Sequence, residues 1–243
     1  MTLMLYREED VQATVDAYRG VTGSTAPVTM GQMPGLVAGL LAPDEREVFL
    51  EKPLDAAKSL FIDTGVAGHL LHTIEVTCRA FPGFMAAPFN SSTESGGRQG
   101  FNLLSESGKV QTYWGGWSNM NVQPATLEGG SSISLNRTFT IRQNRSGWTL
   151  TQRQVNGSIS TVSFPYSSSG SASTETYKIF NYARNAEIHH GLFREAKIFD
   201  ASDALLHDFV PVLRRDWTLA LLDKVTGSVQ PLPAGFIAHL DVV

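Results

Sequence analysis

The sequence predicts a mainly β protein, an antiparallel β-sandwich that carries a small helical hairpin at its N-terminus. From about Leu60 onward, short runs alternate apolar with polar residues, which is the period of strands that bury one face. Clusters of Gly, Ser and Asn separate these runs, and no helical pattern of about 10–15 residues lies between them. We therefore expect a hairpin over residues 1–50 and a sandwich over residues 51–243.

The first helix is expected over Glu8–Arg19. Val11, Val15 and Tyr18 recur at spacings of four and three, which gives one narrow apolar stripe. Acidic residues crowd the start of this segment, where the helix dipole favours negative charge, and Gly20 follows its end.

The second helix is expected to begin at Thr29, because Thr29 and Gln32 have the spacing of a capping box. A hairpin of two narrow stripes is too small to hold a core alone. It is either a cap packed on the sandwich or a surface for self-association and anchoring. The residues of that candidate anchoring or oligomer interface are Val11, Val15, Tyr18, Met33, Leu36, Val37 and Leu40.

Strands fill the rest of the chain. In Thr73–Ala80 the apolar Ile74, Val76 and Cys78 alternate with polar residues, so Cys78 is expected to be a buried core thiol. Asn156-Gly157, the strongest hairpin dipeptide, separates two further strands. The other predicted strands are Phe84–Phe89, Gly100–Leu104, Lys109–Trp114, Thr138–Gln143, Trp148–Gln152, Ser158–Phe164, Tyr177–Asn181, Leu192–Phe199, His207–Val212 and Thr218–Leu222.

Composition excludes several classes of function. The chain of 243 residues carries a net charge of −4, which argues against general nucleic-acid binding. Its single cysteine excludes an intramolecular disulfide and any zinc site that needs two thiolates. No apolar run reaches the roughly 18 residues of a membrane span, and the N-terminus does not resemble a secretory signal. We therefore expect synthesis in the cytosol, no cofactor and no membrane span.

Several segments resemble one family of proteins. Phe61–Val66 resembles the "YIDTG" opening strand of the laminin-G/concanavalin-A-like jelly rolls of bacteriophage structural proteins. Later segments resemble further elements of that family in the same order. They are Ile179-Phe180 with Ala183-Arg184-Asn185 ("IFARN"), Ala196–Asp200 ("KIYD"), Leu205–Val212 ("LVRDFIPV") and Leu221–Gly227 ("GLYDKVTG").

The N-terminal region has its own resemblance. Val15–Leu40 is similar to a segment that recurs in phage tail proteins, "IADAIRxKTGxTxxMTxxQMPxxIAGI". Together the likenesses extend over residues 10–42 and 58–236, although residues 85–175 match no family element. The resemblance implies a phage virion protein with a jelly roll, and it supplies no catalytic residue.

Catalytic and metal-binding patterns are missing from the sequence. Glycosidases of this fold need paired carboxylates, and the acids between residues 84 and 175 are isolated. Adjacent His189-His190 would point to opposite faces of a strand, and His69 and His72 would be split in the same way. We therefore expect neither an enzyme nor a metal site.

The most informative cluster is aromatic, in the segment Tyr113–Asn119. Tyr113, Trp114 and Trp117 beside Asn119 offer rings and polar partners of the kind that sugar binding uses, so they form a candidate glycan rim. Two alternatives stay open: Trp114 is a core ring, or the cluster contacts a neighbouring subunit. Two other tryptophans are expected to be structural, Trp148 in the core and Trp217 at the sandwich edge.

The expected function is that of a bacteriophage tail-fibre or tail-tip component whose jelly roll projects and contacts host glycans. The alternatives are a head fibre or capsid decoration protein, and a stand-alone carbohydrate-binding module. The expected partners are other virion proteins of the tail, portal or capsid, further copies of the chain in a homo-oligomer, with a trimer favoured, and a host surface polysaccharide.

Overall fold

The structure is a computed structural model of the 243-residue chain. It describes residues 45–53, 56, 60–81, 85–92, 98–104, 109–115, 121–124, 137–154, 156–166, 173, 175–181, 191–214 and 216–240. The chain divides into two compact units, Met1–Arg46 with Leu213–Thr218, and Glu47–Val212 with Leu219–Val243. Within the described ranges no helix has the length and apolar character needed to cross a membrane.

The second unit is built mainly of antiparallel strands in two sheets. The larger sheet has the spatial order β11 (Ile159–Pro165), β10 (Gly147–Arg153), β9 (Phe139–Asn144), β4 (Thr73–Ala80), β13 (Gly191–Phe199), β14 (Leu205–Arg214), β15 (Leu219–Asp223) and β16 (Val229–Pro231). It also contains β1 (Glu45–Glu47), β2 (Phe49–Glu51) and β17 (Ile237–His239). The smaller sheet has the order β3 (Ile62–Ala67), β12 (Thr176–Ile179), β5 (Met85–Ser92), β6 (Arg98–Leu104), β7 (Lys109–Trp114) and β8 (Asn121–Pro124).

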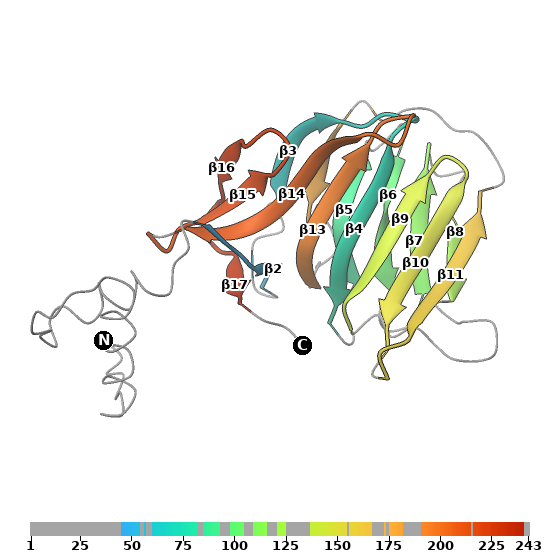
Figure 1. Ribbon diagram of the computed structural model, residues 1–243, viewed down its shortest axis with the longest axis horizontal. Coiled ribbons are helices and arrows are strands. Elements are labelled where there is room, and N and C mark those ends of the chain that lie inside the picture. The colour runs from blue at the N-terminus through green and yellow to red at the C-terminus, as the bar shows by residue number, and fades with distance from the viewer. Residues whose placement is uncertain are drawn as a thin grey trace, which may run out of the picture. The chain divides into compact units, whose positions relative to one another are not determined.

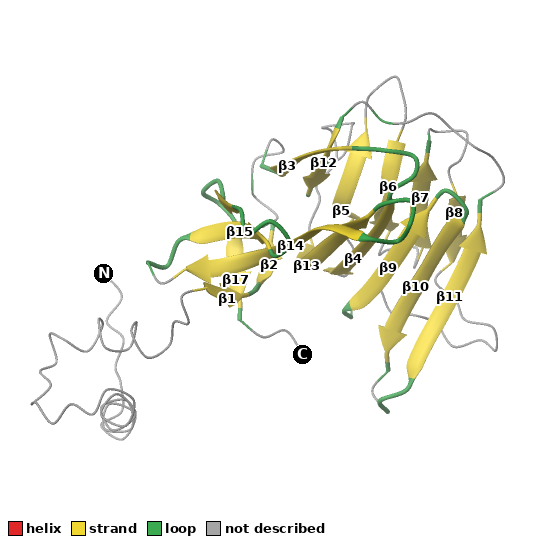
Figure 2. Ribbon diagram, turned by 45° about the horizontal axis from the view of Figure 1, so that its top comes forward, coloured by secondary structure: helices red, strands yellow, loops and turns green. Residues whose placement is uncertain are grey.

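The two sheets form two layers with an apolar core between them (Figures 1 and 2). Burial alternates strictly along β9 and β10, because every second residue of a strand points to the same face. Trp148 and Ile141 enter the core from the larger sheet, and Phe101 and Trp114 enter it from the smaller one. A buried polar link joins the layers, since Gln143 Nε2 donates to the Tyr113 carbonyl oxygen at 2.6 Å.

The prediction of a mainly β antiparallel sandwich is confirmed for the described residues. β4 and β7 have the predicted bounds, and the other predicted strands match within a few residues. The Asn156-Gly157 turn joins β10 to β11 as predicted: Gly157 has a φ of 83°, and Asn156 Oδ1 accepts from the Ser158 backbone N–H at 3.0 Å. The short strands β1, β2, β8, β16 and β17 were not predicted.

The helical hairpin stays a prediction, because both expected helices lie in residues 1–44, outside the described residues. All seven residues of the candidate anchoring interface lie there too. The last residues of the predicted N-terminal region are described, and they form strands rather than helix, namely β1 and β2.

Three expectations about single residues can be compared with the structure. Cys78 is a fully buried free thiol and Trp148 is 2% exposed, so both are core residues as predicted. The expectation that Trp217 packs at the sandwich edge is wrong, because its side chain is 55% exposed. Trp217 lies in a tight turn with a φ of 65°, where its N–H donates to the Arg214 carbonyl oxygen at 2.9 Å.

Candidate functional site

Polar side chains form a continuous row across the outer face of the larger sheet. The register of β11, β10, β9, β4, β13 and β14 places six residues directly beside one another, in the order Ser163, Thr149, Arg142, Glu75, Lys197 and Asp208. Their sequence neighbours, such as Ile141 and Leu150, are buried in the core, so this row faces away from it. The row changes from hydroxyl groups on β10 and β11 to alternating positive and negative charges on the other strands.

Arg142 is the central residue of this row. Its guanidinium donates to Glu75 Oε2 at 3.1 Å and to the Asp203 carboxylate, and it lies 4.5 Å from the centroid of the Phe199 ring. These three contacts fix the direction of a side chain that is still 35% exposed. Arg142 therefore presents a positioned cation beside the neutral hydroxyl groups.

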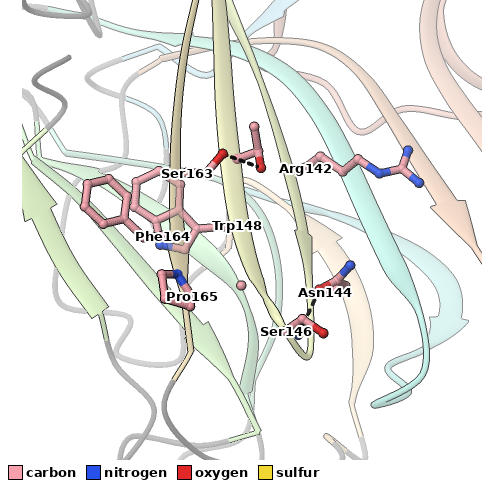
Figure 3. Close-up of a pocket in the computed structure, with 9 residues that line it drawn as sticks. Arg142, Asn144, Ser146, Trp148, Ser163, Phe164 and Pro165 are labelled. Carbon is pink, nitrogen blue, oxygen red and sulfur yellow. Dashed lines mark hydrogen bonds between the residues drawn. The ribbon is translucent and has the colours of Figure 1, made fainter. Parts of the chain in front are cut away.

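A hollow of about 450 Å³ lies on the hydroxyl side of Arg142, and we call it the β9–β11 hollow. Its lining residues are Arg142, Asn144, Ser146, Gly147, Trp148, Thr149, Ser163, Phe164 and Pro165. Figure 3 shows Trp148 and Phe164 on one side of the strands and Arg142 on the other, with Asn144 and Ser146 at the turn.

Gly147, at the β9–β11 hollow, lets the backbones of β10 and β11 approach closely. A Cβ atom at this position would lie 2.3 Å from the Phe164 carbonyl oxygen and 2.9 Å from the Pro165 Cα, so a side chain cannot be accommodated. The turn beside it is held by Asn144 Oδ1, which accepts from the Ser146 N–H at 2.8 Å. Thr149 and Ser163 share a hydrogen bond of 3.0 Å between their hydroxyl oxygens.

A second hollow of about 480 Å³ lies on the other side of Arg142, and we call it the turn hollow. It is lined by residues of the turns before β4, after β9 and after β13, namely Leu71, His72, Thr73, Arg142, Asn144, Arg145, Ser146, Asp200, Ala201 and Asp203. The two hollows share Arg142, Asn144 and Ser146, so they form one polar surface at this end of the larger sheet.

Two titratable groups of the turn hollow have lowered pKa values, for different reasons. Hydrogen bonds from the Ser202 hydroxyl and from the Ala204 and Ser202 backbone N–H groups lower the pKa of Asp200. Burial lowers the pKa of His72, and the neighbouring His69 acts in the same direction. At neutral pH the turn hollow therefore contains an ionised Asp200 carboxylate and a neutral His72 ring.

This surface has the chemistry of a binding site for a polar ligand. Thr149 and Ser163 offer hydroxyl groups, Asn144 offers an amide, and Arg142 offers a cation. The carboxylates of Glu75 and Asp203 are already paired with Arg142. Among the described residues, no group of three or more His, Cys, Asp or Glu side chains could hold a metal ion.

The described residues of the predicted glycan rim, Tyr113 and Trp114, do not line this polar surface. Tyr113 and Trp114 are each 1% exposed, so neither presents a ring face to solvent. Trp114 lies in the main core cluster and its Nε1 donates to the Leu70 carbonyl oxygen at 3.3 Å, which agrees with the alternative that it is a core ring. Trp117 and Asn119 lie outside the described residues.

The histidine pair before β4 was also interpreted wrongly from sequence. His69 and His72 lie in a turn rather than a strand, because the His72 N–H donates to the His69 carbonyl oxygen at 3.0 Å. The turn brings the two ring centroids within 5.3 Å of each other. Gly68 just before this pair was the available turn signal, while nothing in the sequence marked Arg142 or Thr149 as neighbours.

The family-like segments near the C-terminus have a structural role. The Asp223 carboxylate accepts from the Asp208 N–H at 3.0 Å, the Val225 N–H at 3.1 Å and the Thr226 hydroxyl at 2.8 Å. His207 Nδ1 lies 2.8 Å from the same carboxylate. One aspartate thus joins the Leu205–Val212 segment to the Leu221–Gly227 segment, and the acid of the "DKVTG"-like element serves the fold.

No family model matches this chain, and no curated protein matches its sequence. Among solved structures, the chain is similar to domains LG4-5 of the mouse laminin alpha1 chain, with a TM-score of 0.42 and 11% sequence identity. The alignment covers 80% of this chain and 46% of the laminin structure, so this chain spans less than half of it. The likeness is one of fold and says nothing about what this chain binds.

Proposed function

We propose that this chain is a structural component of a bacteriophage virion, a tail-fibre or tail-tip protein with a projecting laminin-G-like jelly roll. The main support is that the segments resembling phage proteins coincide with strands that pair or hydrogen-bond with one another. Phe61–Val66 coincides with β3, which pairs with β12, and the two later segments on β14 and β15 meet at Asp223. Its partners are other virion proteins, and its N-terminal region is the proposed anchor and trimerisation element.

Labelling of intact particles tests this proposal. Virions produced from the genome that encodes the chain would be stained with a gold-labelled antibody against residues 191–240 and imaged by electron microscopy. We expect gold at the tail. Gold on the head would favour the alternative, a head fibre or capsid decoration protein, and purified virions without gold would contradict a virion role.

We further propose that the sandwich binds a host surface polysaccharide without cleaving it. The support is the β9–β11 hollow, where hydroxyl, amide and guanidinium groups lie on one surface and Gly147 also lines the hollow. Directed hydrogen bonds of this kind suit a ligand rich in hydroxyl groups. The same support applies to the second alternative, a stand-alone carbohydrate-binding module outside a virion.

A glycan array with matched variants tests glycan binding and locates the site. Thr149→Val with Ser163→Ala removes two hydroxyl groups from the β9–β11 hollow while keeping its shape, and we expect binding to weaken about tenfold. Thr151→Val is the control, because Thr151 lies two residues along β10 from Thr149, on the same face, and does not line the hollow. A loss of binding confined to Trp117→Ala would instead place the site at the aromatic cluster. If the wild type binds no glycan, the glycan-binding proposal is contradicted and only the virion role remains.

A further inference from the structure

β11 lies at the end of the larger sheet. Among the described strands it pairs with β10 on one side, and no described strand lies on its other side. Figures 1 and 2 both show β11 as the last strand beyond β10. The free side of a terminal strand carries backbone N–H and C=O groups that can pair with another strand.

This edge carries little of the protection that natural proteins usually give to terminal strands. Proteins guard such edges with charged residues, prolines, bulges or very short strands, and of these β11 has only Pro165 at its C-terminal end. β11 is seven residues long, its sequence Ile-Ser-Thr-Val-Ser-Phe-Pro contains no charge, and its register with β10 runs without a bulge. Ile159 is 63% exposed, which is the largest exposure among the large apolar side chains described.

We propose that β11 pairs antiparallel with β11 of a second copy of this chain, about a two-fold axis at Val162. Residues that lie opposite each other in a sheet share one face, so a residue of odd number must lie opposite another of odd number. Of the symmetric registers that meet this condition, only the one centred on Val162 pairs the whole of Ile159–Pro165 with its copy.

The proposed register gives each outer-face residue of β11 a chemically matched neighbour. Thr161 lies opposite the partner's Ser163, which is the same type of pair as Thr149 and Ser163 within the sheet, whose oxygens are 3.0 Å apart. Ile159 lies opposite the partner's Pro165, which has no N–H to donate but covers the most exposed apolar side chain. The pairing continues the larger sheet from one copy into the next.

The pairing also brings two binding surfaces together. Ser163, Phe164 and Pro165 line the β9–β11 hollow and belong to the edge strand itself. The hollows of the two copies therefore lie on the same face of one continuous sheet, on either side of the two-fold axis. A repeating polymer could occupy both, which would add avidity to a weak single contact.

Paired charge substitutions at positions 161 and 163 test the contact and its register. In Thr161→Lys with Ser163→Lys, each new lysine lies directly opposite a lysine of the other copy. In Thr161→Lys with Ser163→Glu, each lysine faces a glutamate instead. Like charges directly opposite destabilise a pair of strands and opposite charges stabilise it.

Sedimentation velocity of the full chain over a range of concentrations gives the readout. Residues 1–50 are proposed to hold one assembly together. We expect two such assemblies of the wild type to associate through β11, which doubles the sedimenting mass. The double lysine variant should associate about tenfold more weakly or not at all, and the lysine–glutamate variant should still double. Thr151→Lys is the matched control, because it adds a charge to the same face one strand further in, and it should still double.

Three outcomes would overturn the proposal. One is a wild type that shows no doubling at any concentration. Another is a double lysine variant that doubles as strongly as the wild type. The third is a lysine–glutamate variant that loses doubling as completely as the double lysine variant while circular dichroism shows both to be folded, since the register then cannot be the one proposed.

Discussion

Asp223 shows how much of this fold can depend on one side chain. Its carboxylate is 2% exposed and accepts hydrogen bonds from two backbone N–H groups and the Thr226 hydroxyl. Burial alone would raise the pKa of Asp223, but the contacts with His207, the Asp208 N–H and Thr226 lower it from 3.8 to about 2. The charged form of Asp223 is therefore stabilised in the folded protein relative to the unfolded chain.

This shift predicts how stability depends on pH. A carboxylate with a lowered pKa in the folded state stabilises the protein above its unfolded pKa, and this contribution disappears as pH falls through the folded pKa. We expect Asp223 to contribute about 2 kcal/mol at neutral pH, and Asp223→Asn to lose most of it. Urea unfolding at several pH values should show the difference between wild type and variant shrinking between pH 4 and pH 2.

Asp216→Asn is the control for this experiment. Asp216 also accepts from a backbone N–H, that of Thr218 at 3.0 Å, and its pKa is also lowered, but its carboxylate is exposed to solvent. Its substitution should change stability little at any pH. If the two variants had the same pH profile, the buried position of Asp223 would not be the cause of its effect.

At the scale of secondary structure elements, the longer strands were predictable and the shortest were not. Thr73–Ala80 and Lys109–Trp114 each span at least six residues, so the alternation between a buried and an open face repeats several times. Val229–Pro231 and Ile237–His239 have three residues each, which is too few for any period to be recognised. Those strands exist because neighbouring strands, β15 and β2, supply their pairing partners.

The candidate site depends on contacts between elements, and a single sequence does not contain them. Arg142, Glu75 and Thr149 are neighbours only because β9 lies between β4 and β10 in one particular register. The aromatic cluster was visible in the sequence, but burial decides whether a ring can meet a ligand. Tyr113 and Trp114 are buried, and no local pattern distinguishes a ring that faces the core from one that faces solvent.

At the scale of the whole molecule, negative charge is concentrated near the N-terminus and extends a few residues past the structural division. Residues 1–55 contain nine acidic and four basic residues, a net charge of −5, while the remaining residues contain 14 acidic and 15 basic residues, a net charge of +1. Residues 1–46 alone contain six acidic and three basic residues, a net charge of −3, because Glu47, Glu51 and Asp55 belong to the second unit. The structural division falls at Arg46, a few residues before the boundary predicted at residue 50.

Two truncated chains, one lacking residues 1–44 and one lacking residues 1–50, show which boundary leaves the sandwich intact. Val48 and Leu50 are fully buried, and β2 pairs with both β13 and β17. Removing residues 1–50 should therefore cost several kcal/mol of unfolding free energy relative to removing residues 1–44, since each buried aliphatic side chain contributes about 1.5–3 kcal/mol.

Urea unfolding of the two truncated chains measures this difference. Sedimentation of the chain that lacks residues 1–44 then tests the anchor separately, because its core strands are intact. We expect that chain to lose the trimer and to keep only the association proposed for β11. Equal stability of the two truncated chains would show that β2 is dispensable, and an unchanged trimer would assign oligomerisation to the sandwich instead of the N-terminal region.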